Sequence, residues 1–147
     1  MNITSNITLI GGYAFYNCKN LMSIIIPSSV TSIGSYAFSG CESLISITIP
    51  PGITSINDNT FRGCISLKTV NITSNITSIG NNTFRNCSSL TSITIPSSVT
   101  SIGSCAFYGC TSLASVIYLG SNDPTEKSAI NIFNESYPSK FVCVSSS

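Results

Sequence analysis

Apolar residues return along this chain at one constant spacing. A phenylalanine set, a cysteine set and a leucine set all follow the same 23-residue period. A period of this length is typical of stacked repeats, in which each unit buries its apolar face against its neighbours. We therefore predict a solenoid whose interior is made of three columns: Phe15, Phe38, Phe61, Phe84 and Phe107; Cys18, Cys41, Cys64, Cys87 and Cys110; and Leu21, Leu44, Leu67, Leu90 and Leu113.

Each repeat begins with a short strand that has one buried face. Residues 44–49 read L-I-S-I-T-I, in which Leu44, Ile47 and Ile49 point inward and the serine and threonine point outward. Pro50 ends this strand, because proline has no N–H for a ladder. A second extended piece follows the turn, and its inward pairs are Val30 and Ile33, Ile53 and Ile56, Ile76 and Ile79, and Val99 and Ile102.

The repeat then closes through a short turn. Gly34, Gly80 and Gly103 share one position, with Asn57 in the equivalent place of another copy, and this choice of residues indicates a positive φ angle. The six residues 36–41 are too few for an autonomous helix, so we predict one helical turn of the 3₁₀ kind on the convex side. Such a turn would aim its phenylalanine and its cysteine together into the interior.

The two ends of the chain differ from the middle. Residues 2–8 repeat as residues 71–77, so the solenoid of residues 1–119 begins within a repeat and without a polar cap, which we interpret as a fragment. Residues 120–147 carry more charge, and we predict a degenerate capping repeat there. Within it, residues 129–133 correspond to the phenylalanine turn and Lys140–Val144 to a last strand. We match the inward pair of that strand, Val142 and Val144, to Val116 and Tyr118 of the preceding repeat.

Composition removes several classes of partner. Charged residues are 7% of the chain and the formal net charge is +1, so there is no electrostatic footprint for nucleic acid. The longest apolar runs are as short as residues 24–26, which excludes membrane insertion. No basic and apolar leader precedes the first repeat, so we expect no secretory signal in this chain. With 42% hydrophobic residues, the chain is not a disordered segment.

Seven cysteines do not form a disulfide framework in this interpretation. Stacked rungs lie about 4.8 Å apart, whereas the Cβ atoms of a disulfide lie about 3.8 Å apart with a restricted dihedral angle. We expect the five column cysteines to be buried free thiols that act as small apolar fillers. A ladder with one cysteine per repeat also spreads thiols too widely for a zinc site. Cys105 and Cys143 fall outside the column, and we expect Cys105 to lie at the start of a turn, where it could be exposed.

The residues that most enzymes need are missing. The chain has no histidine, which removes the Ser-His-Asp and Cys-His arrangements and the commonest general base. Glu42 and Asp58 are the only acids within the repeats and occupy non-equivalent positions, so a carboxylate pair is not expected. The glycines recur singly and do not form a phosphate loop. We predict no catalytic residue, no metal and no cofactor.

The outward face of the strand ladder is the predicted binding surface. Extended surfaces of this kind are how solenoids bind partners. A structural alternative is that these positions hold short polar residues with good strand propensity. The face consists of paired positions on five rungs: Ser23 and Ile25, Ser46 and Thr48, Thr69 and Asn71, Ser92 and Thr94, and Ser115 and Ile117.

The chain also contains seven N-x-[ST] sequons. Chance supplies several in a sequence so rich in asparagine, serine and threonine, but those in turns could carry glycans in a eukaryotic secretory route. Asn71 is the least convenient because it lies on the strand face. The six remaining candidates are Asn2, Asn6, Asn75, Asn81, Asn86 and Asn134.

The repeat pattern resembles the leucine-rich repeats of the Treponema and BspA type. It reads L-x-x-I-x-I-P-x-x-V/I-x-x-I-G-x-x-A/T-F-x-x-C and covers residues 1–119. The resemblance implies a mostly β member of the α/β leucine-rich repeat solenoids, with a parallel strand ladder. It also implies a non-enzymatic adhesion or protein-binding module at the cell surface or outside the cell, whose ligand would be a protein or a glycan.

Two other functions compete with adhesion. The uncapped first rung and the low charge favour a self-assembling structural repeat, as a homo-oligomer or by end-to-end stacking. Regular outward serine and threonine pairs on stacked rungs are also compatible with an ice-binding protein.

Overall fold

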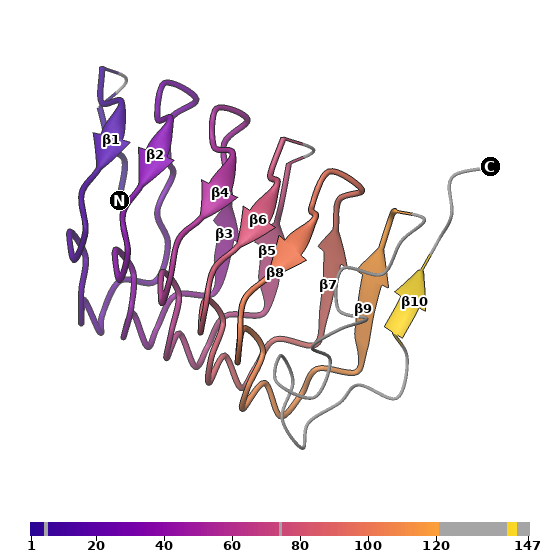
Figure 1. Ribbon diagram of the computed structural model, residues 1–147. Helices are drawn as coiled ribbons and strands as arrows, with labels where there is room; N and C mark the ends of the chain where they lie inside the picture. The colour runs from indigo at the N-terminus through magenta and orange to yellow at the C-terminus, as the bar shows by residue number, and fades with distance from the viewer. Residues whose placement is uncertain (5, 74, 121–140, 144–147) are drawn as a thin grey trace.

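The protein is a mostly β parallel solenoid (Figure 1). The computed structural model describes residues 1–4, 6–73, 75–120 and 141–143. Within these ranges every regular element is a strand, and there is no helix of the length and apolar character that crossing a membrane requires. The strands are β1 (Leu9–Ile10), β2 (Ser32–Ile33), β3 (Ser46–Thr48), β4 (Ser55–Ile56), β5 (Thr69–Asn71), β6 (Ser78–Ile79), β7 (Ser92–Ile95), β8 (Ser101–Ile102), β9 (Ser115–Tyr118) and β10 (Phe141–Cys143).

The strands lie in two rows along the solenoid (Figure 1). We call β3, β5, β7, β9 and β10 the first ladder, and β1, β2, β4, β6 and β8 the second ladder. Ser46 pairs with Thr69 in the first ladder and Ser55 pairs with Ser78 in the second, both in parallel. Each of these pairs joins the same position of two successive repeats, so equivalent positions lie directly over one another.

The predicted core is confirmed for the stacked rungs. Phe38, Phe61, Phe84 and Phe107 are fully buried, and neighbouring rings stack with centroids 5.1 to 5.6 Å apart and planes within 10° of parallel. The inward pairs of the second extended piece are buried as well. A flat side chain repeated at the rung spacing thus forms a continuous stack through the centre.

The cysteine column does more than fill space. Cys41, Cys64, Cys87 and Cys110 are buried and free, as predicted. Each Sγ also donates a hydrogen bond of 3.1 to 3.2 Å to the backbone carbonyl oxygen of the phenylalanine in the preceding rung. The prediction was wrong for Cys18, which is exposed because no described rung covers its outer side.

The predicted 3₁₀ turn is also wrong. The amide groups of residues 36, 38 and 40 donate to carbonyl oxygens of residues 58, 60 and 62 in the next rung, over 2.7 to 3.2 Å. Only the amide groups of residues 37, 39 and 41 bond within the rung, each to the carbonyl oxygen three residues earlier. The segment is therefore a run of β-turns that shares every second N–H with its neighbour, whereas a 3₁₀ helix keeps all of them for itself.

The repeat glycine has a different role from the one predicted. Positive φ angles fall two residues later, at Tyr36 (60°) and Asn82 (54°), and not at Gly34 or Gly80. A Cβ atom added at Gly103 would lie 2.4 Å from the backbone nitrogen of Asn81 in the preceding rung. Glycine at Gly34, Gly80 and Gly103 therefore accommodates a close approach of two backbones.

The end of the chain departs from the predicted register. A strand is present at β10, but Phe141 pairs with Val116 and Val142 pairs with Ile117. Val142 is therefore shifted by one position from the predicted match with Val116. The remainder of the predicted capping repeat, including residues 129–133 and Val144, lies outside the described residues.

Candidate binding surface

The predicted binding face lies on the outer side of the first ladder. Of its ten residues, the eight from Ser23 to Thr94 are exposed, and Ser115 and Ile117 are half-buried. The alternation within β7, exposed at Ser92 and buried at Ile93, shows how the pleat separates this face from the core. The side-chain Nδ2 of Asn71 donates to Thr48 Oγ1 over 3.4 Å. This hydrogen bond links two rungs across the face. A role in binding remains a prediction for all ten residues.

The first rungs of this face carry an apolar cluster that the sequence interpretation missed in part. Met22 is 61% exposed, Ile25 is 66% exposed and Ile45 is 43% exposed. We call these three residues the apolar cluster. Ile25 belonged to the predicted face, whereas Met22 and Ile45 stand at the unconstrained position after the repeat leucine. Lysine, threonine and alanine hold that position in the later rungs. The two large apolar residues at this otherwise variable position were the sequence signal that could have predicted the cluster.

Two shallow hollows adjoin the apolar cluster. One is lined by residues 23–26 and 46–48 of two successive rungs. The other extends over several rungs and is lined by Met22, Ser43, Ile45, Ser66, Lys68 and Ser89. Apolar and polar residues therefore line both hollows, and Lys68 is the one cation among these lining residues.

The described residues contain no group of three histidine, cysteine or acidic side chains that could hold a metal. Burial raises the pKa of the Cys41 thiol to about 11 and that of Cys110 to about 12, so both thiols stay protonated near neutral pH. The ion pair of Lys19 and Glu42, 2.9 Å long, is largely exposed to solvent.

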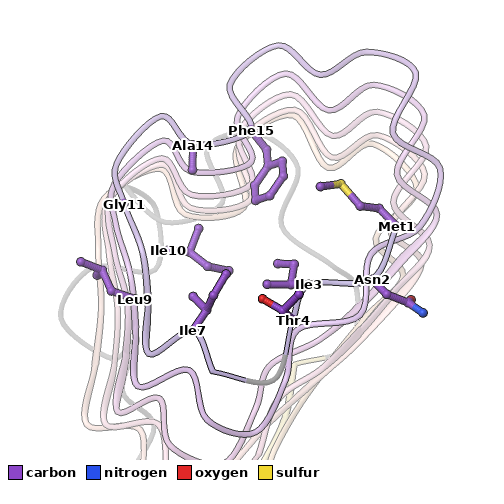
Figure 2. A pocket seen from close by; sticks show the side chains of 10 residues that line it. All are labelled: Met1, Asn2, Ile3, Thr4, Ile7, Leu9, Ile10, Gly11, Ala14 and Phe15. Atoms are coloured by element: carbon purple, nitrogen blue, oxygen red, sulfur yellow. The ribbon is translucent and has the colours of Figure 1, made fainter.

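The open face of the first rung is a second apolar surface. Figure 2 shows Ile3, Ile10 and Phe15 pointing into the interior of this rung, while Leu9 points away from it. Phe15 is half-buried, although its four counterparts are fully buried. The same side chains that join rungs elsewhere are thus left partly uncovered here.

The sequons of the described residues are all on the surface. Asn71 and the candidates Asn2, Asn6, Asn75, Asn81 and Asn86 are exposed. Three of them use the side-chain amide within the fold: Asn71 bonds to Thr48 as described above, Asn75 Nδ2 donates to the carbonyl oxygen of Pro51 over 2.7 Å, and Asn81 Oδ1 accepts from the backbone amide of Ser104 over 2.8 Å. Asn134 lies outside the described residues. Glycosylation of these sites stays a prediction.

Comparisons with known proteins agree with the repeat pattern. The family described as the BspA type leucine rich repeat region matches residues 1–136 in 6 copies. The crystal structure of a Treponema pallidum leucine rich repeat protein is similar, with 37% identity and a TM-score of 0.77 over 80% of this chain. A leucine rich cell surface protein from Faecalibacterium prausnitzii A2-165 is 32% identical, with a TM-score of 0.64 over 84% of this chain. The chain spans 57% and 40% of the lengths of these two proteins. No curated protein matches significantly.

Proposed function

Because the chain belongs to the BspA-type leucine-rich repeat family, we propose that it is a non-enzymatic adhesion module that binds a partner protein at the cell surface or outside the cell. Leucine-rich repeat proteins are generally protein-interaction modules. The surface location is supported by the relative from Faecalibacterium prausnitzii, which is described as a cell surface protein.

The apolar cluster is the observation that carries this proposal. Large apolar side chains that remain more than two-fifths exposed leave much of their apolar area uncovered by the fold, and neighbouring ones mark interaction sites. Covering Met22, Ile25 and Ile45 with a partner would contribute on the order of 1 to 2 kcal/mol each. The neighbouring serine and threonine residues would form the polar rim that surrounds such anchors.

The test compares two variants that each remove one exposed apolar side chain from a different ladder. Ile25→Ser changes the first ladder, and Leu9→Ser, at a residue that is 59% exposed, changes the second. Binding to a panel of purified extracellular-matrix proteins is measured by surface plasmon resonance. We expect saturable binding to at least one of them, weakened about tenfold by Ile25→Ser and unaffected by Leu9→Ser. Equal affinity of both variants and the wild type would show that the partner does not bind at Ile25 on the outer side of the first ladder.

Self-association is a second candidate function, favoured by the open face of the first rung. Ile7 lines that face and is 36% exposed. A lysine at this position would place a charge in the apolar surface and should abolish association through it. Sedimentation velocity over a hundredfold range of concentration would show whether oligomers form and whether Ile7→Lys removes them. Monomers of the wild type at every concentration would exclude this candidate and leave the adhesion proposal intact.

A further inference from the structure

The second of the two hollows beside the first ladder extends along the stack of rungs. Ser43, Ser66 and Ser89 hold the same repeat position in three successive rungs and line it as a half-buried row. Ile45 and Lys68 line it as well, and the backbone amide of Lys68 donates to the carbonyl oxygen of Ile45 over 2.8 Å. These two residues are therefore neighbours in successive rungs. We call this elongated hollow the serine groove.

The serine groove lies within the stack and not at its open end. Ile45 is 43% exposed although Met22 and Lys68 hold the same repeat position in the rungs before and after it. Lys68 is exposed as well, with Ile45 on one side and Thr91 on the other. The exposure of both side chains is therefore a property of the outer surface, and it does not depend on how the first rung is covered.

Lys68 has no counter-ion among the described residues. The acids of the described part of the chain are both engaged elsewhere. Glu42 pairs with Lys19 at 2.9 Å, and Asp58 accepts hydrogen bonds from the backbone and side-chain amides of Asn81. A partner that complements the charge of the serine groove therefore carries an acidic group.

The serine row indicates that this partner is a polypeptide. The hydroxyl groups of Ser43, Ser66 and Ser89 form no hydrogen bond with the described residues. A fatty acyl chain laid over them would remove three hydroxyl groups from water without a partner, which is unfavourable. The lining residues include no aromatic side chain on which the apolar face of a sugar ring could stack. An amphipathic polypeptide supplies apolar side chains for Ile45 and polar groups for the serines.

The spacing of the rungs favours a helix over an extended segment. Neighbouring strands of a ladder lie about 4.8 Å apart, so the two steps from Ser43 to Ser89 span about 9.6 Å. Residues i and i+7 of an α-helix are about 10.5 Å apart along its axis, a mismatch of about 1 Å. Residues i and i+4 of a strand, which point to the same side, are about 13 Å apart, a mismatch of about 4 Å. A helix that lies along the groove thus presents one side chain per turn to each rung.

We propose that the serine groove binds an amphipathic α-helix of a partner protein, in which two apolar residues one turn apart are followed one turn later by an acidic residue. The apolar residues pack against Met22 and Ile45. The carboxylate pairs with Lys68 and accepts hydrogen bonds from Ser66 and Ser89. This orientation also brings the negative end of the helix dipole toward Lys68. The proposal rests on the proposed function, because it names the segment that occupies part of the same surface.

The experiment measures the binding of a fluorescently labelled helical peptide to the full 147-residue chain by anisotropy. The peptide is rich in alanine and glutamine, is capped at both ends, and carries leucine at positions i and i+4 and glutamate at i+7. We expect saturable binding that Lys68→Glu weakens at least about tenfold. A second peptide with lysine at i+7 should bind the Lys68→Glu variant more tightly than it binds the wild type. Such a reversal cannot come from a failure of the variant to fold.

The matched control is Arg62→Glu, which reverses an exposed cation on the β-turns of the same rung, outside the serine groove. This variant should bind the glutamate peptide as the wild type does. A third peptide, with proline between the two leucines, does not form the helix and should not bind.

Several outcomes would overturn the proposal. They are failure of the wild type to bind the glutamate peptide, equal binding by Lys68→Glu, and equal binding of the proline peptide, which would indicate an extended segment. Binding of polygalacturonate in place of the peptide, lost in Lys68→Glu, would identify an acidic glycan as the partner and would overturn it too. Binding of a matrix protein that Ile25→Ser weakens, without binding of the glutamate peptide, would reject the helix and leave the proposed function standing.

Discussion

Single side chains in this molecule act as members of columns. Phe61 is fully buried and stacks on Phe38 at 5.5 Å and on Phe84 at 5.6 Å, so both of its faces are covered. Phe15 occupies the same repeat position but has a partner on one side only among the described residues. The same residue type is therefore expected to contribute differently to stability in different rungs.

Phe61→Ala should lower the free energy of unfolding by about 3 to 5 kcal/mol, because the ring leaves a cavity between two fixed neighbours. Phe15→Ala is the control, and its cost should be clearly smaller since this ring is half-buried. Urea denaturation of both variants measures the difference. Equal losses would mean that the columns do not determine stability.

The buried thiols make stability depend on alkaline pH. Burial raises the pKa of Cys41 from 9.0 to about 11, and it also raises the pKa of Cys64 and of Cys87. Below pH 9 the folded and unfolded states both hold these protons. Above pH 9 the unfolded state releases them while the folded state retains them, so the free energy of unfolding falls as the pH rises from 9 to about 11.

Cys64→Ala should make this decline shallower, because one of the thiols that titrate on unfolding is gone. Urea denaturation of the variant and the wild type at pH 8, 9, 10 and 11 gives the two slopes. Tyrosine and lysine ionise in both proteins and cancel in the comparison. Parallel slopes would show that the thiol at residue 64 does not contribute.

The repeat unit is an element with two kinds of rung-to-rung contact. In the strand rows the contact is an ordinary parallel ladder, and in the turns every second amide reaches the next rung. Gly34, Gly80 and Gly103 lie between these two regions, where the backbones of neighbouring rungs approach closely. The position is occupied by Asn57 in one rung, where its Nδ2 donates to the carbonyl oxygen of Ile33 over 2.7 Å.

Gly103→Ala should destabilise the protein by about 1 to 3 kcal/mol, because its Cβ would press on the backbone of Asn81. Gly11 supplies the control, since it has the same repeat position but nothing within 4 Å of an added Cβ. Gly11→Ala should be neutral or slightly stabilising. Thermal denaturation of both variants checks the pair, and a similar effect at the two sites would rule out the close approach as the cause.

Periodicity predicted more of the fold than local patterns did. The constant spacing was sufficient to place Phe38 and Cys64 inside, because a repeated apolar residue has no other surface to bury against. The turn at residues 36–41 was misassigned because half of its hydrogen-bond partners lie in the next rung. The local sequence of the turn does not indicate these partners. Gly34 was assigned a positive φ angle because sequence does not distinguish a conformational need from a steric one. Met22 was overlooked because the repeat places no constraint on its position.

At the scale of the whole molecule the structure is a linear stack in which each rung contacts its neighbours only. Stability then behaves as a sum of repeat terms and interface terms. The first rung has one described interface, and its Phe15, Cys18 and Leu21 are all more exposed than their counterparts in the middle. Opening should therefore begin at this end.

Hydrogen exchange followed by mass spectrometry should show this gradient. Amides of residues 9–18 are expected to exchange fastest among the turns and strands up to β8, and those of residues 55–64 slowest. The two segments hold the same repeat positions, so a difference in protection that persists after correction for intrinsic exchange rates reports position in the stack. Uniform protection along the chain would indicate a single cooperative unit.

The hydrogen bonds between rungs also decide how the molecule responds to force. They run along the long axis in the strand rows and in the turns, so a pull applied at the two ends loads one interface after another. Each rung that detaches would release one repeat, about 75 Å of extended chain. A chain built in this way lengthens in equal steps at low force. An optical trap would record one step of extension for every repeat.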